Sequence, residues 1–178
     1  RLDRTRLLVI GAGEMAELAL RHFVEHGVAA VTLINRTHER ALALTHDDTR
    51  VPVTVREWSE LGAALGAHDI VVASTGATHA VITGEAARLA LRRRRAAMMF
   101  IDLAVPRDVD PMVGDLDEAY LYNIDDLEQV VAANQQLRAD EVDAAAELID
   151  RRVADALRAT DRDRGRLHRA VADRFEGL

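Results

Sequence analysis

The chain of 178 residues contains neither cysteine nor lysine. Without cysteine it can form no disulfide, no thiolate metal site and no cysteine nucleophile. Because all of its basic residues are arginines, a Schiff base and the lysine-bearing loop of P-loop proteins are excluded as well. Aromatic residues make up only 3% of the chain, which argues against a nucleic-acid surface built from rings that stack on bases.

Long apolar runs and excess positive charge are also lacking. No apolar run approaches the roughly 20 residues that a membrane span needs, and residues 1–4 lead into a strand-like run rather than a signal peptide. The formal net charge of −7 argues against general binding of polyanions, although a local basic patch is compatible with it. We expect a cytoplasmic protein without membrane contact. The first residue is Arg1 rather than Met, as in a piece cut from a longer protein.

Short apolar runs alternate with helical patterns over the first 124 residues. Strands are expected at 7–10, 31–34, 51–55, 70–73, 98–101 and 119–122, and helices at 14–26, 38–46, 57–65 and from 83 to the arginine cluster 92–95. Strands separated by helices favour right-handed crossovers. The pattern therefore predicts an α/β protein with a doubly wound parallel sheet.

The composition changes near Asp125. Residues 125–159 contain no Gly or Pro and are rich in strong helix formers, which predicts a helix about 50 Å long. Such a helix packs against a second copy of itself or folds back on its own domain; we expect a homodimer. A break over 160–165 and a short amphipathic helix over 166–175 complete the chain. We divide the protein into a domain over 1–124 and a helical region over 125–178.

A glycine turn follows the first expected strand and opens the first helix. The pattern G-x-G-x-x-A is formed by Gly11, Ala12, Gly13, Glu14, Met15 and Ala16. In this context the first glycine permits a tight turn, the second lets the backbone approach a pyrophosphate, and the small last residue lets helix and strand pack closely. The free N–H groups of the helix then face the phosphates. The motif predicts a Rossmann-like dinucleotide site; a plain turn is the alternative.

The end of the second strand indicates which dinucleotide binds. An NAD site would have an Asp or Glu there to accept from the ribose 2′-hydroxyl, but this chain has Asn35, Arg36 and Thr37. Arg36 can pair with a 2′-phosphate, and its two neighbours can donate hydrogen bonds. We therefore predict NADPH. In the alternative interpretation Arg36 is a solvated side chain and Thr37 only caps a helix.

Two further stretches end strands at the same edge of the sheet. Ser74, Thr75, Gly76 and Ala77 follow the fourth strand, where the nicotinamide half of a cofactor would lie; a structural turn is the alternative. Residues 102–108 end the fifth strand and are expected to line the same crevice, so Leu103 and Ala104 complete the predicted cofactor-binding residues. Asp102 and Arg107 either pair with one another or contact substrate.

Some signals have a simpler interpretation. Residues 22–26 match H-x-x-E-H, a zinc-protease pattern, but they lie on the first helix and have no evident third ligand, so we predict no metal. The cluster 92–95 is expected to be a solvated helix end rather than a contact with a nucleic-acid backbone. For His68 and His79 we expect ordinary surface or turn roles.

The order of these motifs resembles glutamyl-tRNA reductase. The matching stretches are residues 9–15, 35–37, 73–77, 101–108 and 120–127. The last two are far more specific than the glycine turn. The resemblance covers about residues 5–155, and residues 160–178 do not match.

The resemblance implies an NADPH-dependent oxidoreductase that reduces glutamyl-tRNA to glutamate-1-semialdehyde in tetrapyrrole biosynthesis. Such enzymes have an N-terminal catalytic domain that binds glutamyl-tRNA and forms a thioester on a cysteine. A spinal helix after their NADPH domain leads into a dimerisation bundle. This chain would be the NADPH domain with the start of that helix. We therefore expect it to hold no catalytic residue and to be inactive alone.

Two other functions remain open. In the first alternative, the chain is a free-standing NADP-binding module for regulation or dimerisation. In the second it is part of an oxidoreductase resembling shikimate dehydrogenase, which shares the fold and the Asn-Arg-Thr feature. Those enzymes are less similar over 101–108 and 120–127, and they use a lysine–aspartate pair in another domain.

Overall fold

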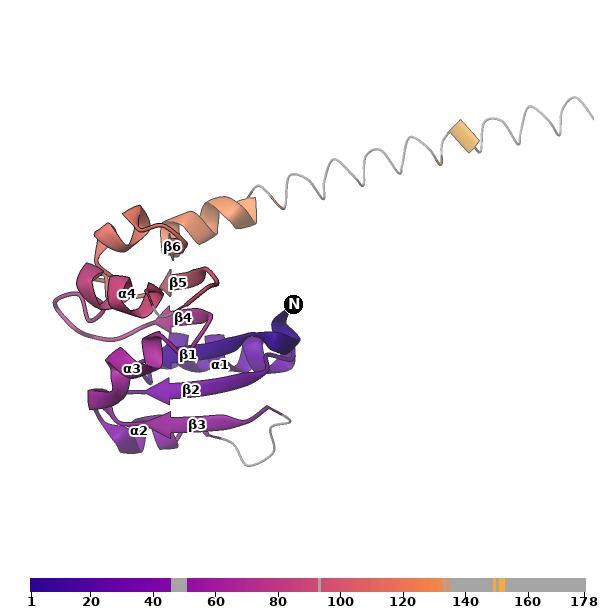
Figure 1. Ribbon diagram of the computed structural model, residues 1–178. Helices are drawn as coiled ribbons and strands as arrows, with labels where there is room; N and C mark the ends of the chain where they lie inside the picture. The colour runs from indigo at the N-terminus through magenta and orange to yellow at the C-terminus, as the bar shows by residue number, and fades with distance from the viewer. Residues whose placement is uncertain (46–50, 93, 133, 135–148, 150, 153–178) are drawn as a thin grey trace, which may run out of the picture. The chain divides into compact units, whose positions relative to one another are not determined.

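The computed structural model describes residues 1–45, 51–92, 94–132, 134, 149 and 151–152 (Figure 1). The chain divides into two compact units, Arg1–Glu128 and Gln129–Leu178. Residues 124–132 are helical, so a helix does begin near the position where the composition changes. Most of the helix predicted over 125–159, and all of residues 160–178, lie outside the described residues.

The first unit is built on a six-stranded sheet in the order β3-β2-β1-β4-β5-β6, with every neighbouring pair parallel (Figure 1). The strands are β1 (Arg6–Ile10), β2 (Ala30–Ile34), β3 (Val53–Arg56), β4 (Ile70–Ala73), β5 (Met98–Asp102) and β6 (Ala119–Asn123). The chain starts at the centre, moves outward to β3 and returns to β4 on the other side of β1. The predicted doubly wound α/β sheet is thus confirmed, with its switch point between β1 and β4.

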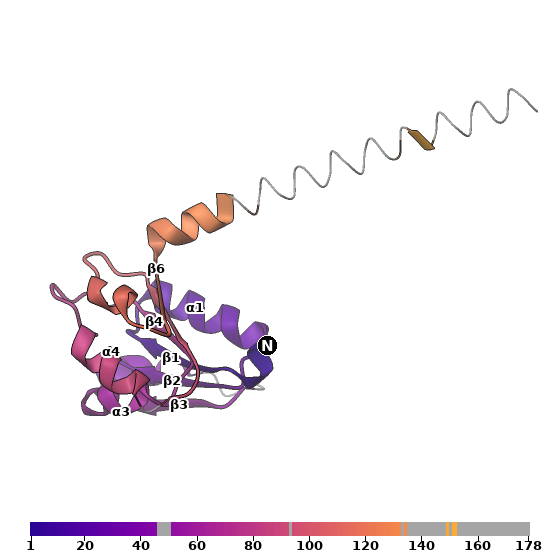
Figure 2. The ribbon, with the colours of Figure 1, turned by 45° about the horizontal axis from the view of Figure 1, so that its top comes forward.

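Helices cover both faces of this sheet (Figure 2). They are α1 (Glu14–Glu25), α2 (His38–Leu42), α3 (Leu61–Leu65) and α4 (Gly84–Leu91), with 3₁₀ turns at Leu2–Arg4, Trp58–Glu60 and Pro111–Asp115. The helix predicted over 38–46 is shorter, and the one predicted over 57–65 is divided into a 3₁₀ turn and α3. Thr83 caps α4, because its hydroxyl accepts a hydrogen bond of 3.2 Å from the N–H of Ala86.

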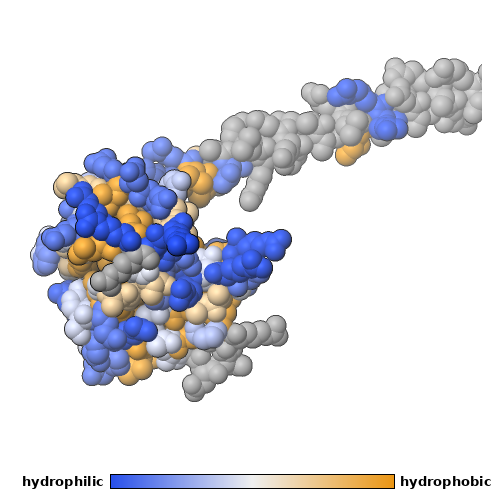
Figure 3. Space-filling view, viewed as in Figure 1, coloured by the Kyte–Doolittle hydropathy of each residue, from blue (hydrophilic) through white to orange (hydrophobic). Residues whose placement is uncertain are grey.

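The core has one layer on each side of the sheet. Leu7 and Val9 of β1 belong to the layer under α1, whereas Leu8 and Ile10 belong to the layer under α3 and α4. Side chains of a strand alternate between faces, so burial on both faces requires a continuous apolar run. On the surface, hydrophilic and apolar residues are interspersed (Figure 3). Among the described residues, no helix combines the length and apolar character that crossing a membrane would require.

Candidate functional site

A cleft of about 710 Å³ lies at the carboxyl ends of the central strands. Its walls come from the loops that follow β1, β2, β3 and β4, so it lies at the switch point of the sheet. The lining residues are Gly11, Ala12, Gly13, Glu14, Met15, Asn35, Arg36, Thr37, Arg40, Trp58, Ser74, Thr75 and Gly76.

The absence of a side chain has a different structural consequence at each of the two glycines of the turn. Gly11 has φ +114°, and a Cβ atom there would collide with the carbonyl oxygen of Ser74. The turn after β1 therefore packs directly against the backbone of the loop after β4. Gly13 has extended backbone at the N-cap of α1, and a Cβ built there would meet nothing within 4 Å. Its lack of a side chain leaves the start of α1 open to the cleft.

Two arginines line the cleft beyond β2. Arg36 and Arg40 are four residues apart, and both are exposed. Within the described part of the chain, neither guanidinium is paired with a carboxylate. Asn35 donates from Nδ2 to the carbonyl oxygen of Thr37 at 2.8 Å, so its amide holds the turn at the wall of the cleft. Thr37 occupies the N-cap of α2 but makes no side-chain capping bond.

A buried carboxylate holds the cleft wall that follows β4. Thr75 donates to Asp108 from its backbone N–H, at 2.5 Å, and from its hydroxyl, at 2.6 Å. The N–H of Ala77 donates to the same hydroxyl at 3.1 Å. Burial raises the pKa of Asp108, while the hydrogen bonds from Thr75 act in the opposite direction. This loop is thus positioned by a side chain outside the lining of the cleft.

The carboxylate of Asp102 binds backbone N–H groups of the loop that follows β5. Asp102 accepts hydrogen bonds of 3.0 Å from the N–H groups of Ala104 and Val109. Arg107 donates instead to Asp125, at 2.7 Å. The pairing of Asp102 with Arg107 that was one of the two predicted alternatives is therefore wrong, because backbone groups of the loop already satisfy the Asp102 carboxylate.

Four predicted residues do not line the cleft: Ala16, Ala77, Leu103 and Ala104. Ala16 is fully buried on the face of α1 that packs on the sheet, where a small side chain brings helix and strand together, and Leu103 packs against the same layer of the core. Ala77 and Ala104 are also buried. Their loops fold inward because Thr75 and Asp102 bind the backbone there.

Two residues of the site were missed by the sequence reasoning, since Arg40 and Trp58 line the cleft. Asp108 belongs to the stretch 102–108 that was expected to line the crevice, but it supports the wall from behind instead. Arg40 lies four residues after Arg36, in the short helix α2 that follows β2, so its nearness to Arg36 in the chain is a usable signal. Trp58 follows the edge strand β3, and no local pattern distinguishes it from a core residue.

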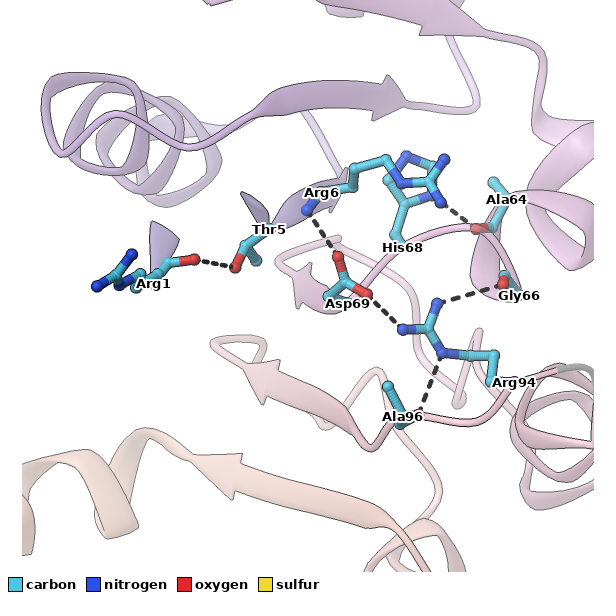
Figure 4. Close-up of polar contacts among 9 residues, drawn as sticks. All are labelled: Arg1, Thr5, Arg6, Ala64, Gly66, His68, Asp69, Arg94 and Ala96. Carbon is cyan, nitrogen blue, oxygen red and sulfur yellow. Dashed lines mark hydrogen bonds and ion pairs between the residues drawn. The ribbon is translucent and has the colours of Figure 1, made fainter. Parts of the chain in front are cut away.

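The opposite, amino-terminal edge of the sheet holds a partly buried ion pair (Figure 4). The guanidinium of Arg94, whose side chain is 8% exposed, pairs with Asp69 and donates to the carbonyl oxygen of Gly66 at 3.3 Å. Asp69 also accepts from the N–H of Arg6 at 2.8 Å. The predicted solvated helix end over 92–95 is therefore wrong for Arg94, which joins the end of α4 to the strands.

The histidines differ in their surroundings. His68 is buried directly after the turn at 66–67, with a backbone carbonyl of α3 at 2.7 Å and the Thr32 hydroxyl at 2.8 Å. Of the surface or turn role that was predicted, the surface alternative is therefore wrong. Burial lowers its pKa. His79 is exposed. Within residues 22–26, which match a zinc-protease pattern, His26 Nδ1 lies 2.8 Å from the carbonyl oxygen of His22. No group of acids and histidines among the described residues is arranged to hold a metal ion.

Known proteins match most of the chain. Residues 1–130 match the family model described as shikimate / quinate 5-dehydrogenase. The glutamyl-tRNA reductase of Geobacter metallireducens is 45% identical over 152 residues, which are 85% of this chain and 34% of that protein. The glutamyl-tRNA reductase of Trichlorobacter lovleyi is 48% identical over 148 residues, which are 83% of this chain and 33% of that protein.

A solved structure agrees with these sequence relatives. Glutamyl-tRNA reductase from Methanopyrus kandleri has a TM-score of 0.71 and 37% identity, covering 79% of this chain and 35% of that one. This chain therefore spans about a third of the length of its relatives. The chain belongs to the shikimate / quinate 5-dehydrogenase family, and the resemblance to glutamyl-tRNA reductase that its motifs predicted is confirmed.

Proposed function

We propose that this chain is the NADPH-binding domain of a glutamyl-tRNA reductase. The observation that carries the proposal is a pair of guanidiniums, Arg36 and Arg40, in a cleft at the switch point of the sheet, neither of which pairs with a carboxylate of the residues that the structure describes. A 2′-phosphate is the group that distinguishes NADPH from NADH, and guanidinium is its best-suited partner. The glutamyl-tRNA reductase relatives support the same function.

The residues present fit this cofactor. The open backbone at Gly13 and the N-terminus of α1 suit the pyrophosphate. Arg36 and Arg40 suit the 2′-phosphate, and the small residues of 74–76 leave room for the nicotinamide half. When bound, NADPH supplies the hydride. The chain itself binds and orients it, and Asp108 keeps the wall after β4 in place through Thr75.

The remaining steps belong to the whole protein. In the proposed reaction glutamyl-tRNA is reduced to glutamate-1-semialdehyde, a step of tetrapyrrole biosynthesis, through a thioester on a cysteine. This chain has no cysteine, so it binds NADPH without reducing the substrate by itself. Residues 125–178 form a homodimer in this proposal, and the compartment is the cytoplasm, where aminoacyl-tRNA is made.

Binding of NADPH and NADH to the purified chain, measured by calorimetry, tests the proposal. We expect NADPH to bind about 10- to 100-fold more tightly, as hydrogen bonds between charged groups predict. Arg36→Ala should remove most of this preference and leave NADH binding unchanged. Equal affinities for the two nucleotides in the unaltered chain would contradict the assignment of Arg36.

A further inference from the structure

Trp58 is the one tryptophan of the chain, and it lines the cleft without a role in the function proposed above. It begins the 3₁₀ turn that follows β3. Its side chain is partly buried and packs against the layer of the core under α3 and α4. One large aromatic side chain therefore belongs to both the core and the wall of the cleft.

The turn that carries Trp58 is held firmly. Glu57 and Glu60 form a reciprocal capping box, with the N–H of Glu57 donating to Glu60 at 3.0 Å. Glu57 also lies 3.0 Å from Nδ1 of His38, the first residue of α2. Since α2 also carries Arg40, the turn that holds the tryptophan lies beside the helix that holds a proposed phosphate ligand.

The strand order places Trp58 at one end of the ligand. Along the carboxyl edge the loops follow in the order β4, β1, β2 and β3, which presents 74–76, the glycine turn, Arg36 with Arg40, and then Trp58. The groups of NADPH follow in the same order, from nicotinamide through pyrophosphate to the 2′-phosphorylated ribose and adenine. Because the 2′-phosphate and adenine share one ribose, an anchor at Arg36 leaves the base beside the next loop.

We propose that Trp58 is the stacking wall for the adenine base and so a determinant of dinucleotide affinity. The inference rests on the proposed NADPH site. An indole offers a flat apolar surface to a purine, and one stacked base changes affinity by about 5- to 100-fold on removal of the ring. The role belongs to binding and does not involve the transfer of hydride.

Trp58 reports on its own ligand, because all tryptophan emission comes from this residue. The full chain is titrated with adenosine 2′,5′-bisphosphate and, separately, with nicotinamide mononucleotide. We expect saturable quenching by the adenosine compound at the dissociation constant that calorimetry gives, and no quenching by the mononucleotide. Unchanged emission at calorimetric saturation with the adenosine compound would overturn the role of Trp58.

Variants provide the second measurement. Trp58→Leu keeps an apolar contact with the core and should weaken NADPH and adenosine 2′,5′-bisphosphate alike, by about 10-fold. Trp58→Phe should restore both affinities to within about 3-fold, since a smaller ring still stacks. Tyr120→Leu is the matched control, because it removes an exposed aromatic ring of β6 that does not line the cleft.

The outcomes separate the two proposals. If Trp58→Leu binds both ligands as the unaltered chain does, the stacking role is wrong and the NADPH site stands. If the unaltered chain shows no heat with NADPH, the proposed function fails and the stacking role fails with it. Should Trp58→Leu not fold, as judged by circular dichroism, the titration of the unaltered chain still decides.

Discussion

Charge is used differently at the two edges of the sheet. At the amino-terminal edge, Arg94 pairs with Asp69 and its side chain is almost fully buried. At the carboxyl edge, Arg36 and Arg40 are exposed, line the cleft and have no carboxylate partner among the described residues. The same side-chain type thus joins secondary structure elements at one edge and remains free for an anion at the other. Substitutions that should separate stability from binding test this difference.

The largest effect is expected at the glycine turn. Gly11→Ala should lower the free energy of unfolding by about 3 kcal/mol or more, because it combines a left-handed backbone with a collision against Ser74. Urea unfolding followed by circular dichroism measures this. Gly13→Ala is the matched control: its extended backbone and open surroundings predict a cost of about 1 kcal/mol or less, with weaker NADPH binding. Equal destabilisation by both variants would refute the packing argument.

The amino-terminal ion pair should affect stability alone. Arg94→Met leaves Asp69 without its cation and should cost about 2 kcal/mol, less than for a fully buried pair because a third of the Asp69 side chain is exposed. NADPH affinity should stay unchanged, since neither residue lines the cleft.

Arg36→Ala should show the reverse, with weaker NADPH binding and a free energy of unfolding within about 0.5 kcal/mol of that of the unaltered chain. A loss of NADPH affinity in folded Arg94→Met would break the separation of the two edges.

The smallest effects concern pH. Burial alone would raise the pKa of Asp69, but hydrogen bonds from the Arg6 N–H and from Arg94, with the charges of both arginines, lower it overall. The unfolded state then binds the proton first, so the contribution of Asp69 to stability is present above its unfolded pKa and is lost as pH falls through the folded value. The pKa of Asp108 is raised by burial, so its contribution is present at low pH and is lost as pH rises through the folded value.

Asp69→Asn and Asp108→Asn should therefore change the pH dependence of stability in opposite directions. Asp69→Asn should remove part of the loss of stability at acid pH, below about pH 4. Asp108→Asn should remove part of the loss that accompanies a rise of pH from about 4 upward. Urea midpoints measured from pH 3 to pH 7 give both slopes. A change of the same sign in both variants would contradict the assigned causes.

Local sequence patterns were sufficient to predict which strands and helices the sheet unit contains, but not where each of them ends. The run Leu7 to Ile10 is apolar without interruption, and it is buried on both faces. The edge strand was predicted at 51–55 but extends over Val53–Arg56, since an edge strand has weaker sequence constraints. The helix predicted over 38–46 ends at Leu42. Element ends depend on packing and capping, which the sequence indicates only weakly.

The site was predicted in part. The segments 11–15, 35–37 and 74–76 were found, because each directly follows a strand that ends at one edge. Arg40 and Trp58 were missed, because they come close to the other loops of the site only in the folded chain and belong to no recognised sequence motif. Whether NADPH binds there stays a prediction, to be tested by the affinities above.

The alternation of strands and helices, the glycine turn and the absence of an acid after the second strand were determined by the sequence alone, because each is a local pattern whose consequence follows from general geometry. The partners of charged and polar side chains were decided only by the tertiary structure. Arg94 is buried against Asp69, whereas Arg36 is exposed in the cleft. Both are arginines beside apolar segments, and only the folded positions of distant carboxylates distinguish them.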